Sequence, residues 1–119
     1  MPIRVKQRTA LFFATSRNIE PAYEYIKKLK DPIGRQKIRT NIRKAEKGNF
    51  GKEGSDYRHI SGDIWELKID YGPGYRVYFG LENDSLILLL LAGSKKSQTK
   101  DIEDSKKYWN EFKSQKVEK

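Results

Sequence analysis

The strongest constraint on the fold of this chain is a six-residue apolar run, residues 86–91, that follows a stretch of alternating apolar and polar residues, 64–79. Alternation with a period of two predicts strands that bury one face. An uninterrupted apolar run predicts a strand that is buried on both faces. Gly72-Pro73-Gly74 divides the alternating stretch and is typical of a turn. We therefore expect a β-hairpin beside a central strand.

The two faces of the predicted hairpin differ in chemical character. One face is apolar and is expected to join the core; its members are Trp65, Leu67, Ile69, Tyr71, Tyr75, Val77 and Phe79. The other face carries Glu66, Lys68 and Arg76, and pairing around the turn brings Lys68 or Asp70 roughly opposite Arg76. A carboxylate or lysine base beside cations that hold a phosphate can cleave RNA through its own 2′-hydroxyl, without a metal. Polar residues are also expected on the outer face of any antiparallel sheet, so this pattern alone leaves both interpretations open.

Three helices are expected around these strands. The first covers residues 19–30, with Asn18 as a possible cap. The second begins at Asp31-Pro32, a strong start signal, and runs to about Lys47. The third follows Thr99 as its cap and faces the core with Ile102, Trp109 and Phe112.

A strand at residues 3–6, whose extension through Leu11-Phe12-Phe13 the sequence leaves open, precedes the helices, so the predicted element order is β-α-α-β-β-β-α. This order predicts an α+β domain of two layers, with an antiparallel sheet, two N-terminal helices and one C-terminal helix. Residues 1–113 are expected to form this single domain, and residues 114–119 a polar C-terminal tail.

Positive charge is concentrated in the first half of the chain. Residues 1–60 carry fifteen Lys and Arg against six Asp and Glu, whereas residues 61–119 carry ten of each. Such a basic region attracts a polyanion, either nucleic acid or an acidic protein, although a solvated lysine-rich surface has the same composition. The predicted second helix has the densest charge. Its candidate RNA-binding residues are Arg35, Arg39, Arg43 and Lys47.

The composition excludes several kinds of site. The chain has no cysteine, which excludes disulfides, thiolate metal sites and cysteine nucleophiles. It has one histidine, His59, and no clustered carboxylate pattern that would hold Mg²⁺, so neither a metal nor a cofactor is expected. No apolar run approaches the ~20 residues of a membrane span, and no secretory signal is recognisable. We therefore expect a soluble, cytoplasmic protein.

Residues 62–79 read GDIWELKIDYGPGYRVYF, and residues 88–102 read LLLLAGSKKSQTKDI. Both stretches closely resemble the RelE/ParE superfamily of toxins, and most of all its HigB-like "addiction module killer protein" branch, whose members read WELRIDYGPGYRVYF and LLxGGDKSxQxxDI. The GNFG loop after the second helix and the inward tryptophan of the last helix also match. The resemblance covers roughly residues 19–113, and its three separated motifs occur in the same order.

The resemblance implies a toxin of a type II toxin–antitoxin pair, namely a metal-free endoribonuclease (mRNA interferase) that inhibits translation. The implied partners are mRNA, the ribosome and a small helix-turn-helix, HigA-like antitoxin, with no membrane. By motif, Arg76 would bind the scissile phosphate and stabilise the transition state. Lys68 and Lys95 or Lys96 would add positive charge, and Glu66 is the nearest candidate base. His59 precedes the hairpin, where some relatives carry base or phosphate-binding residues, and joins the candidate RNA-binding residues.

Two other functions remain open from the sequence. ParE-type members of the superfamily poison DNA gyrase by binding and lack nuclease residues, and an inactive remnant would still bind its antitoxin. The presence of both Arg76 and Lys68 favours the nuclease. This chain has Gly93-Ser94-Lys95-Lys96 where the branch reads GGDK, and the resemblance assigns no general acid.

Overall fold

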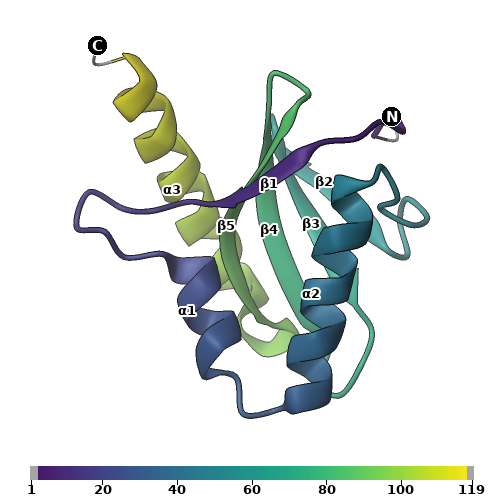
Figure 1. Ribbon diagram of the computed structural model, residues 1–119. Helices are drawn as coiled ribbons and strands as arrows, with labels where there is room; N and C mark the ends of the chain where they lie inside the picture. Colours follow the sequence, from purple (N-terminus) through teal and green to yellow (C-terminus); the bar gives the residue numbers. More distant parts are fainter. Residues whose placement is uncertain (1–2, 118–119) are drawn as a thin grey trace.

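A five-stranded mixed sheet forms the centre of the molecule (Figure 1). The computed structural model describes residues 3–117, with side chains as far as residue 115. The strands are β1 Thr9–Phe12, β2 Tyr57–Ser61, β3 Ile64–Ile69, β4 Tyr75–Glu82 and β5 Leu86–Ser94. The helices are α1 Pro21–Lys28, α2 Pro32–Glu46, the short 3₁₀ helix η1 Lys95–Ser97, and α3 Gln98–Val117. The strand order in the sheet is β1-β5-β4-β3-β2, and the predicted α+β class is confirmed.

The predicted hairpin is formed by β3 and β4. Its register pairs Trp65 with Phe79 and Lys68 with Arg76, as the alternation around the glycine turn predicts. Gly72 and Gly74 have φ angles of 57° and 82°, in the left-handed region that favours glycine, so this turn depends on its two glycines.

The predicted central strand is β5. It pairs antiparallel with β4 and parallel with β1, and its side chains are buried on both faces of the sheet. Ile87 and Leu89 pack on one side, whereas Leu88 and Leu90 pack on the other. An apolar run without alternation is what a strand between two covered faces requires.

The sheet is mixed, so the expectation of an antiparallel sheet is wrong for one strand pair. The first strand is also later than predicted: it is Thr9–Phe12 rather than residues 3–6, and it runs parallel to β5. Val5 is 80% exposed, whereas the later segment packs Ala10 and Phe12 against the core. It also pairs with the β5 edge that β4 leaves open.

A further strand, β2, was not predicted. It extends the sheet beyond β3 as an edge strand, and His59 pairs with Trp65 in its register. Its sequence, YRHIS, places only Tyr57 in the buried class, and a glycine-rich, charged loop precedes it. An edge strand with so little apolar content gives a weak sequence signal.

The helices begin and end close to the predicted positions, with three differences. Asp31 caps α2 as predicted, because its carboxylate accepts a hydrogen bond from the backbone N–H of Gly34. The first helix is shorter than residues 19–30, and its N-cap residue is Glu20, not Asn18. The last helix starts at Gln98, since η1 leads directly into it, and Thr99 therefore lies inside the helix rather than at its cap. It continues to Val117, within the segment expected to be a tail; residues 118–119 lie outside the described residues.

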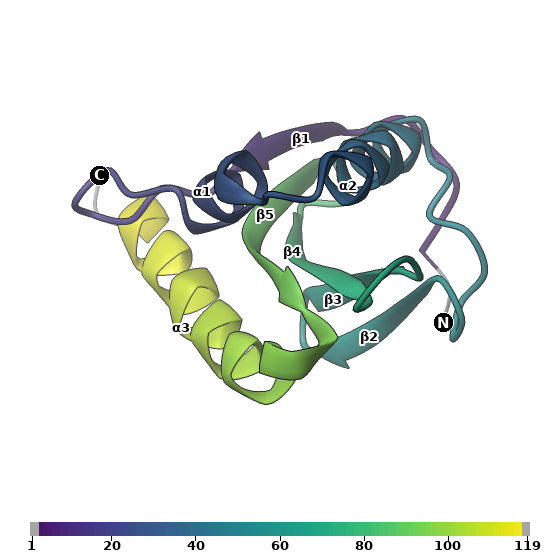
Figure 2. The ribbon, with the colours of Figure 1, turned by 90° about the horizontal axis from the view of Figure 1, so that it is seen from below.

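The helices cover opposite faces of the sheet (Figure 2). Helices α1 and α2 lie over one face, and the larger core cluster there includes Ile26, Ile38, Leu67, Val77 and Leu89. Helix α3 packs on the other face over a smaller cluster, whose buried members are Phe13, Ile64, Leu88, Leu90 and Trp109. Figure 1 shows α3 diverging from the sheet towards its C-terminal end. The outer face of the hairpin is therefore partly covered by α3, and partly open.

Candidate functional site

Polar and charged residues meet on the face of the sheet that α3 partly covers. Directly paired residues on neighbouring strands project from the same face, which brings two rows of side chains together. In one row, Arg58 pairs with Glu66 and Glu66 with Tyr78; in the other, Lys68 pairs with Arg76. Together with Lys95 of η1, these residues form what we call the Arg76 cluster: Arg58, Glu66, Lys68, Arg76, Tyr78 and Lys95.

Glu66 lies at the buried centre of this cluster. Its side chain is 0% exposed, and each carboxylate oxygen accepts a hydrogen bond. Arg58 Nε donates to Oε1 at 2.7 Å, and Gln98 Nε2 at the start of α3 donates to Oε2 at 2.8 Å. Glu66, predicted as the nearest candidate base, is thus enclosed by partners and joins β2, β3 and α3.

Arg76 is half-buried at the border of the same cluster. Its Nη1 donates to the backbone oxygen of Tyr75 at 3.0 Å, and its buried Nε has no hydrogen-bond partner among the described residues. A buried, unpaired guanidinium N–H is unusual and costs free energy unless a ligand or water pairs with it. Among the cations of the Arg76 cluster, Arg76 is the one with a buried donor that has no partner among the described residues, which makes it a phosphate-binding candidate.

The turn at Gly74 brings the predicted loop cation next to Arg76. The backbone N–H of Lys95 donates to the oxygen of Gly74 at 2.6 Å. A Cβ placed on Gly74 would lie 3.4 Å from Arg76 Nη1 and 3.6 Å from Lys95 Cβ. Lys95 and Lys96 are both exposed, and Lys68 Nζ donates to the oxygen of Gly54 at 3.0 Å. The register and the turn therefore gather Lys68, Arg76 and Lys95 in one region, with Lys96 adjoining it.

The electrostatics of the cluster follow from the buried carboxylate. The hydrogen bond to Glu66 raises the pKa of the Arg58 guanidinium above its ordinary value. Burial, and then the neighbouring Glu66 charge, raise the pKa of the Tyr78 phenol well above its ordinary value, so this hydroxyl keeps its proton at neutral pH. Burial likewise raises the pKa of Asp101, whose carboxylate accepts a hydrogen bond from Ser97 at 2.5 Å.

The predicted RNA-binding arginines lie away from this cluster. Helix α2 covers the opposite face of the sheet, and its arginines point along the flank towards α1 and β1. Arg35 is half-buried and donates to the backbone oxygen of Leu29 at 2.5 Å. Arg39 and Arg43 are exposed and line a cavity of about 250 Å³ beside Tyr23. Lys47, also exposed, is the residue that ends α2.

His59 is also separated from the Arg76 cluster. It follows Arg58 in β2, so its side chain projects from the other face of the sheet. Its ring centroid lies 4.8 Å from that of Trp65, and its Nε2 is 2.7 Å from the backbone oxygen of Gly62. These contacts hold His59 against the turn between β2 and β3, on the face of the sheet opposite to that of Glu66.

Sequence reasoning missed three members of the site: Arg58, Tyr78 and Gln98. Arg58 belongs to the unpredicted strand β2, and only its alternation with His59 and Tyr57 could have revealed it. Tyr78 stands on the polar face of the predicted hairpin and was not given a role. Gln98 approaches Glu66 through a contact 32 residues apart in the chain, which spacing does not encode.

Within the described part of the chain, no group of three or more His, Asp or Glu side chains is placed to hold a metal ion. In residues 3–117, no helix is both long and apolar enough to cross a bilayer. Glu66 and Tyr78 are buried, whereas the side chains of the Arg76 cluster that are exposed or half-buried end in ammonium or guanidinium groups. Such groups favour an anionic ligand such as a phosphodiester.

Comparison with known proteins identifies the family of this chain. The sequence model of the family described as "Phage derived protein Gp49-like (DUF891)" matches residues 24–112. This chain belongs to the Gp49-like family. An uncharacterized protein of Haemophilus influenzae is 40% identical over 82 residues, which cover 69% of this chain and 79% of that protein. The Gp49-like family is related to the RelE-type toxins, so the toxin resemblance of the sequence is supported at the level of this family.

Proposed function

We propose that this protein is the toxin of a type II toxin–antitoxin pair, and that it is an endoribonuclease that cleaves mRNA without a metal ion. Membership of the Gp49-like family supports a toxin-like protein. The Arg76 cluster supports phosphodiester chemistry, because cations from two strands and η1 meet at one place. In this proposal the protein acts in the cytoplasm on mRNA at the ribosome and thereby inhibits translation.

The single observation that carries the nuclease proposal is the environment of Arg76. Its guanidinium donates a hydrogen bond to the backbone oxygen of Tyr75 and has one buried N–H without a partner among the described residues. Both this guanidinium and the Cβ of Lys95 lie beside Gly74. A fixed, partly desolvated guanidinium stabilises the charge that develops on a phosphorane more strongly than a mobile surface cation does. Lys68, opposite Arg76 in the register, adds a second cation.

The proposed reaction uses the 2′-hydroxyl of the RNA as its nucleophile. The 2′-oxygen attacks the adjacent phosphorus and gives its proton to a solvent water, while the bond from phosphorus to the 5′-oxygen breaks and that oxygen takes up a proton. The products are a 2′,3′-cyclic phosphate and a 5′-hydroxyl. Arg76 holds the non-bridging oxygens, and an ammonium of Lys95 or Lys96 supplies the proton to the leaving oxygen.

Glu66 has a different role in this proposal from the general base expected from the sequence. Its carboxylate is enclosed by Arg58 and Gln98, so it orients these two side chains rather than contacting RNA. Arg58 is 42% exposed in its side chain and is thereby presented towards the open part of the sheet face. Arg58 joins Arg76, Lys68 and Lys95 as a phosphate-binding candidate.

The cognate antitoxin is proposed to be a small helix-turn-helix protein of the HigA kind, in keeping with the family relationship. An acidic segment of such a protein, or its bulk, would keep the toxin from the ribosome. The basic first half of the chain, with a net charge of +9, suits either an acidic antitoxin segment or ribosomal RNA.

Induced expression in bacteria tests the proposed function. Wild-type protein is expected to arrest growth with fragmented mRNA, whereas Arg76→Ala should lose about 3 kcal/mol of transition-state stabilisation, about a hundredfold in rate. Arg17→Ala, which removes an exposed loop arginine, is the matched control and should remain toxic. Growth arrest with intact mRNA and induced DNA repair would instead identify a gyrase poison. Toxicity retained by soluble Arg76→Ala, or no arrest by the wild type, would also refute the proposal.

A further inference from the structure

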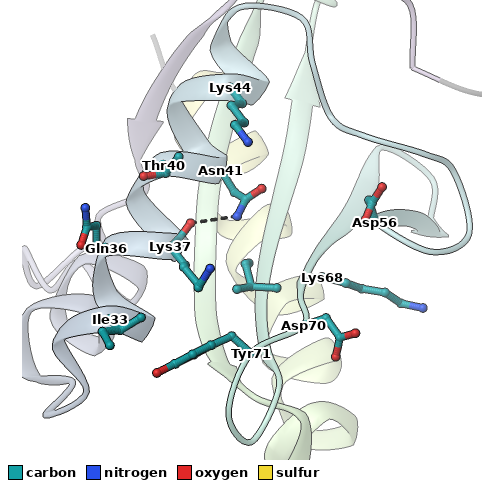
Figure 3. Close-up of a pocket in the computed structure, with 11 residues that line it drawn as sticks. Ile33, Gln36, Lys37, Thr40, Asn41, Lys44, Asp56, Lys68, Asp70 and Tyr71 are labelled. Carbon is teal, nitrogen blue, oxygen red and sulfur yellow. Dashed lines mark hydrogen bonds between the residues drawn. The ribbon is translucent and has the colours of Figure 1, made fainter.

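A polar groove lies between helix α2 and the end of strand β3 (Figure 3). Its volume is about 460 Å³, and we call it the α2–β3 groove. The residues of its lining that matter here are Lys37, Asn41, Lys44, Lys68, Asp70 and Tyr71. It lies on the flank of α2 that faces away from Arg39 and Arg43. Of its lining residues, Lys68 alone also belongs to the Arg76 cluster.

The helix side of the groove carries a straight line of donors. Lys37, Asn41 and Lys44 occur at spacings of four and three, so they share one stripe of α2. Figure 3 shows all three pointing towards the strand, with both lysine ammonium groups in the groove. The two lysines are seven residues apart, about 10.5 Å along the helix axis. Both are exposed, so their amines are available to an anion.

The strand side of the groove carries the aromatic ring of Tyr71 and the carboxylates of Asp56 and Asp70. Tyr71 is half-buried, and Lys37 Nζ lies 5.4 Å from its ring centroid. Asp70 is exposed, while the Asp56 carboxylate accepts a hydrogen bond from the backbone N–H of Lys52 at 2.7 Å. One wall of the groove is therefore cationic, and the other combines an aromatic face with hydrogen-bond acceptors.

Lys68 links this groove to the candidate active site. It lines the groove from β3, and its register partner on β4 is Arg76. In Figure 3 its side chain extends away from α2, beyond the edge of the groove. Lys68 thus lies between the groove, which it lines from β3, and the strand pair that carries Arg76.

We propose that the α2–β3 groove binds a single-stranded segment of the RNA substrate adjoining the cleaved phosphate. This inference rests on the proposed nuclease function. The phosphodiesters lie along Lys37 and Lys44, and the sugar and base side faces Asp70 and Tyr71. Carboxylates accept hydrogen bonds from ribose hydroxyls and base amino groups, and an aromatic face stacks on bases. An acidic peptide is disfavoured, because it has neither the bases that stack on Tyr71 nor the ribose hydroxyls that donate to Asp70.

Salt-dependent RNA binding tests this proposal. Each full-length protein carries Arg76→Ala so that cleavage of the probe is about a hundredfold slower, and a short fluorescein-labelled single-stranded RNA is titrated by anisotropy at several salt concentrations. Each lysine–phosphate contact contributes about −0.7 to the slope of log K against log salt. Replacing Lys37 and Lys44 by glutamine should reduce the slope by about 1.4, and weaken binding about 25-fold at about 0.1 M salt.

Two variants control for charge and position. Lys106→Gln with Lys107→Gln removes two exposed lysines of α3, and it should leave both slope and affinity close to those of the parent. Arg39→Gln with Arg43→Gln removes the same charge from the other flank of α2. A larger effect of the arginine pair than of the Lys37/Lys44 pair would overturn the proposal, as would equal effects of all three pairs or no RNA binding by the parent. This experiment measures RNA binding rather than cleavage. A failure of the groove proposal can therefore be told apart from a failure of the proposed nuclease function.

Discussion

The buried ion pair between Arg58 and Glu66 provides a quantitative test of how the candidate site is built. Glu66 is fully buried, whereas the Arg58 side chain is 42% exposed, and 2.7 Å separates Arg58 Nε from Glu66 Oε1. The two partners therefore differ in what their loss leaves behind. Arg58→Met leaves a buried carboxylate held only by Gln98, whereas Glu66→Gln leaves an arginine that water can solvate.

The magnitudes follow from that asymmetry. Arg58→Met should lower the free energy of unfolding by about 3 kcal/mol, near the lower end for breaking a buried pair. Glu66→Gln keeps the shape and loses one charge-assisted hydrogen bond, about 1.5 kcal/mol. The double variant should cost less than the sum of the two, with a coupling of at least about 1 kcal/mol.

Urea denaturation at neutral pH, with unchanged m-values, measures these free energies. The exposed pair of Lys28 and Glu24 is the matched control: it lies one helical turn apart in α1, and Lys28→Met should cost less than about 0.5 kcal/mol. The reasoning is refuted if Arg58→Met costs no more than the Lys28 control, or if the two single changes are simply additive.

Two further outcomes are expected from packing and from titration. Gly80→Ala should destabilise the protein by about 1–3 kcal/mol, because a Cβ there collides with the ring of Trp109 on α3. Thermal unfolding measures this loss, and the double variant Gly80→Ala with Trp109→Leu should recover part of it. Burial, and then the hydrogen bond to Asp31, raise the pKa of Tyr75 to about 12 from its ordinary 10. The folded state holds this proton more tightly than the unfolded chain, so stability is complete below about pH 10 and declines as the pH rises towards 12. Tyr75→Phe should make the melting temperature fall less steeply over that interval, and an unchanged pH dependence would contradict the assignment.

The sheet was predictable wherever side-chain alternation or an apolar run controls burial. The β3–β4 hairpin has the predicted pairing of Lys68 with Arg76, and β5 is buried on both faces. Strand β2 was not predictable in the same way, because only its first residue, Tyr57, is buried. His59 was named as a candidate from the family resemblance, whereas its neighbour Arg58, which projects from the opposite face of the sheet, holds Glu66.

In α2, the spacing of residues predicts which side chains share a face of the helix, but not where the helix lies on the sheet. The four-residue spacing of its arginines correctly indicates a common flank, and Ile38, Ile42 and Ala45 form the predicted buried stripe. Spacing does not state which face of the sheet that stripe covers. The structure places α2 opposite the Arg76 cluster, and a tertiary contact, Gln98 to Glu66, completes the site from α3.

The chemistry of the RNA ends tests the central claim most directly. Purified protein is added to a translating mixture with a defined mRNA, and the termini of the fragments are identified by mass spectrometry, with Arg76→Ala in parallel. The account predicts fragments that end in a 2′,3′-cyclic phosphate or its 3′-phosphate product and begin with a 5′-hydroxyl, formed about a hundredfold more slowly by Arg76→Ala. Intact mRNA, or fragments with 3′-hydroxyl and 5′-phosphate ends, would contradict it.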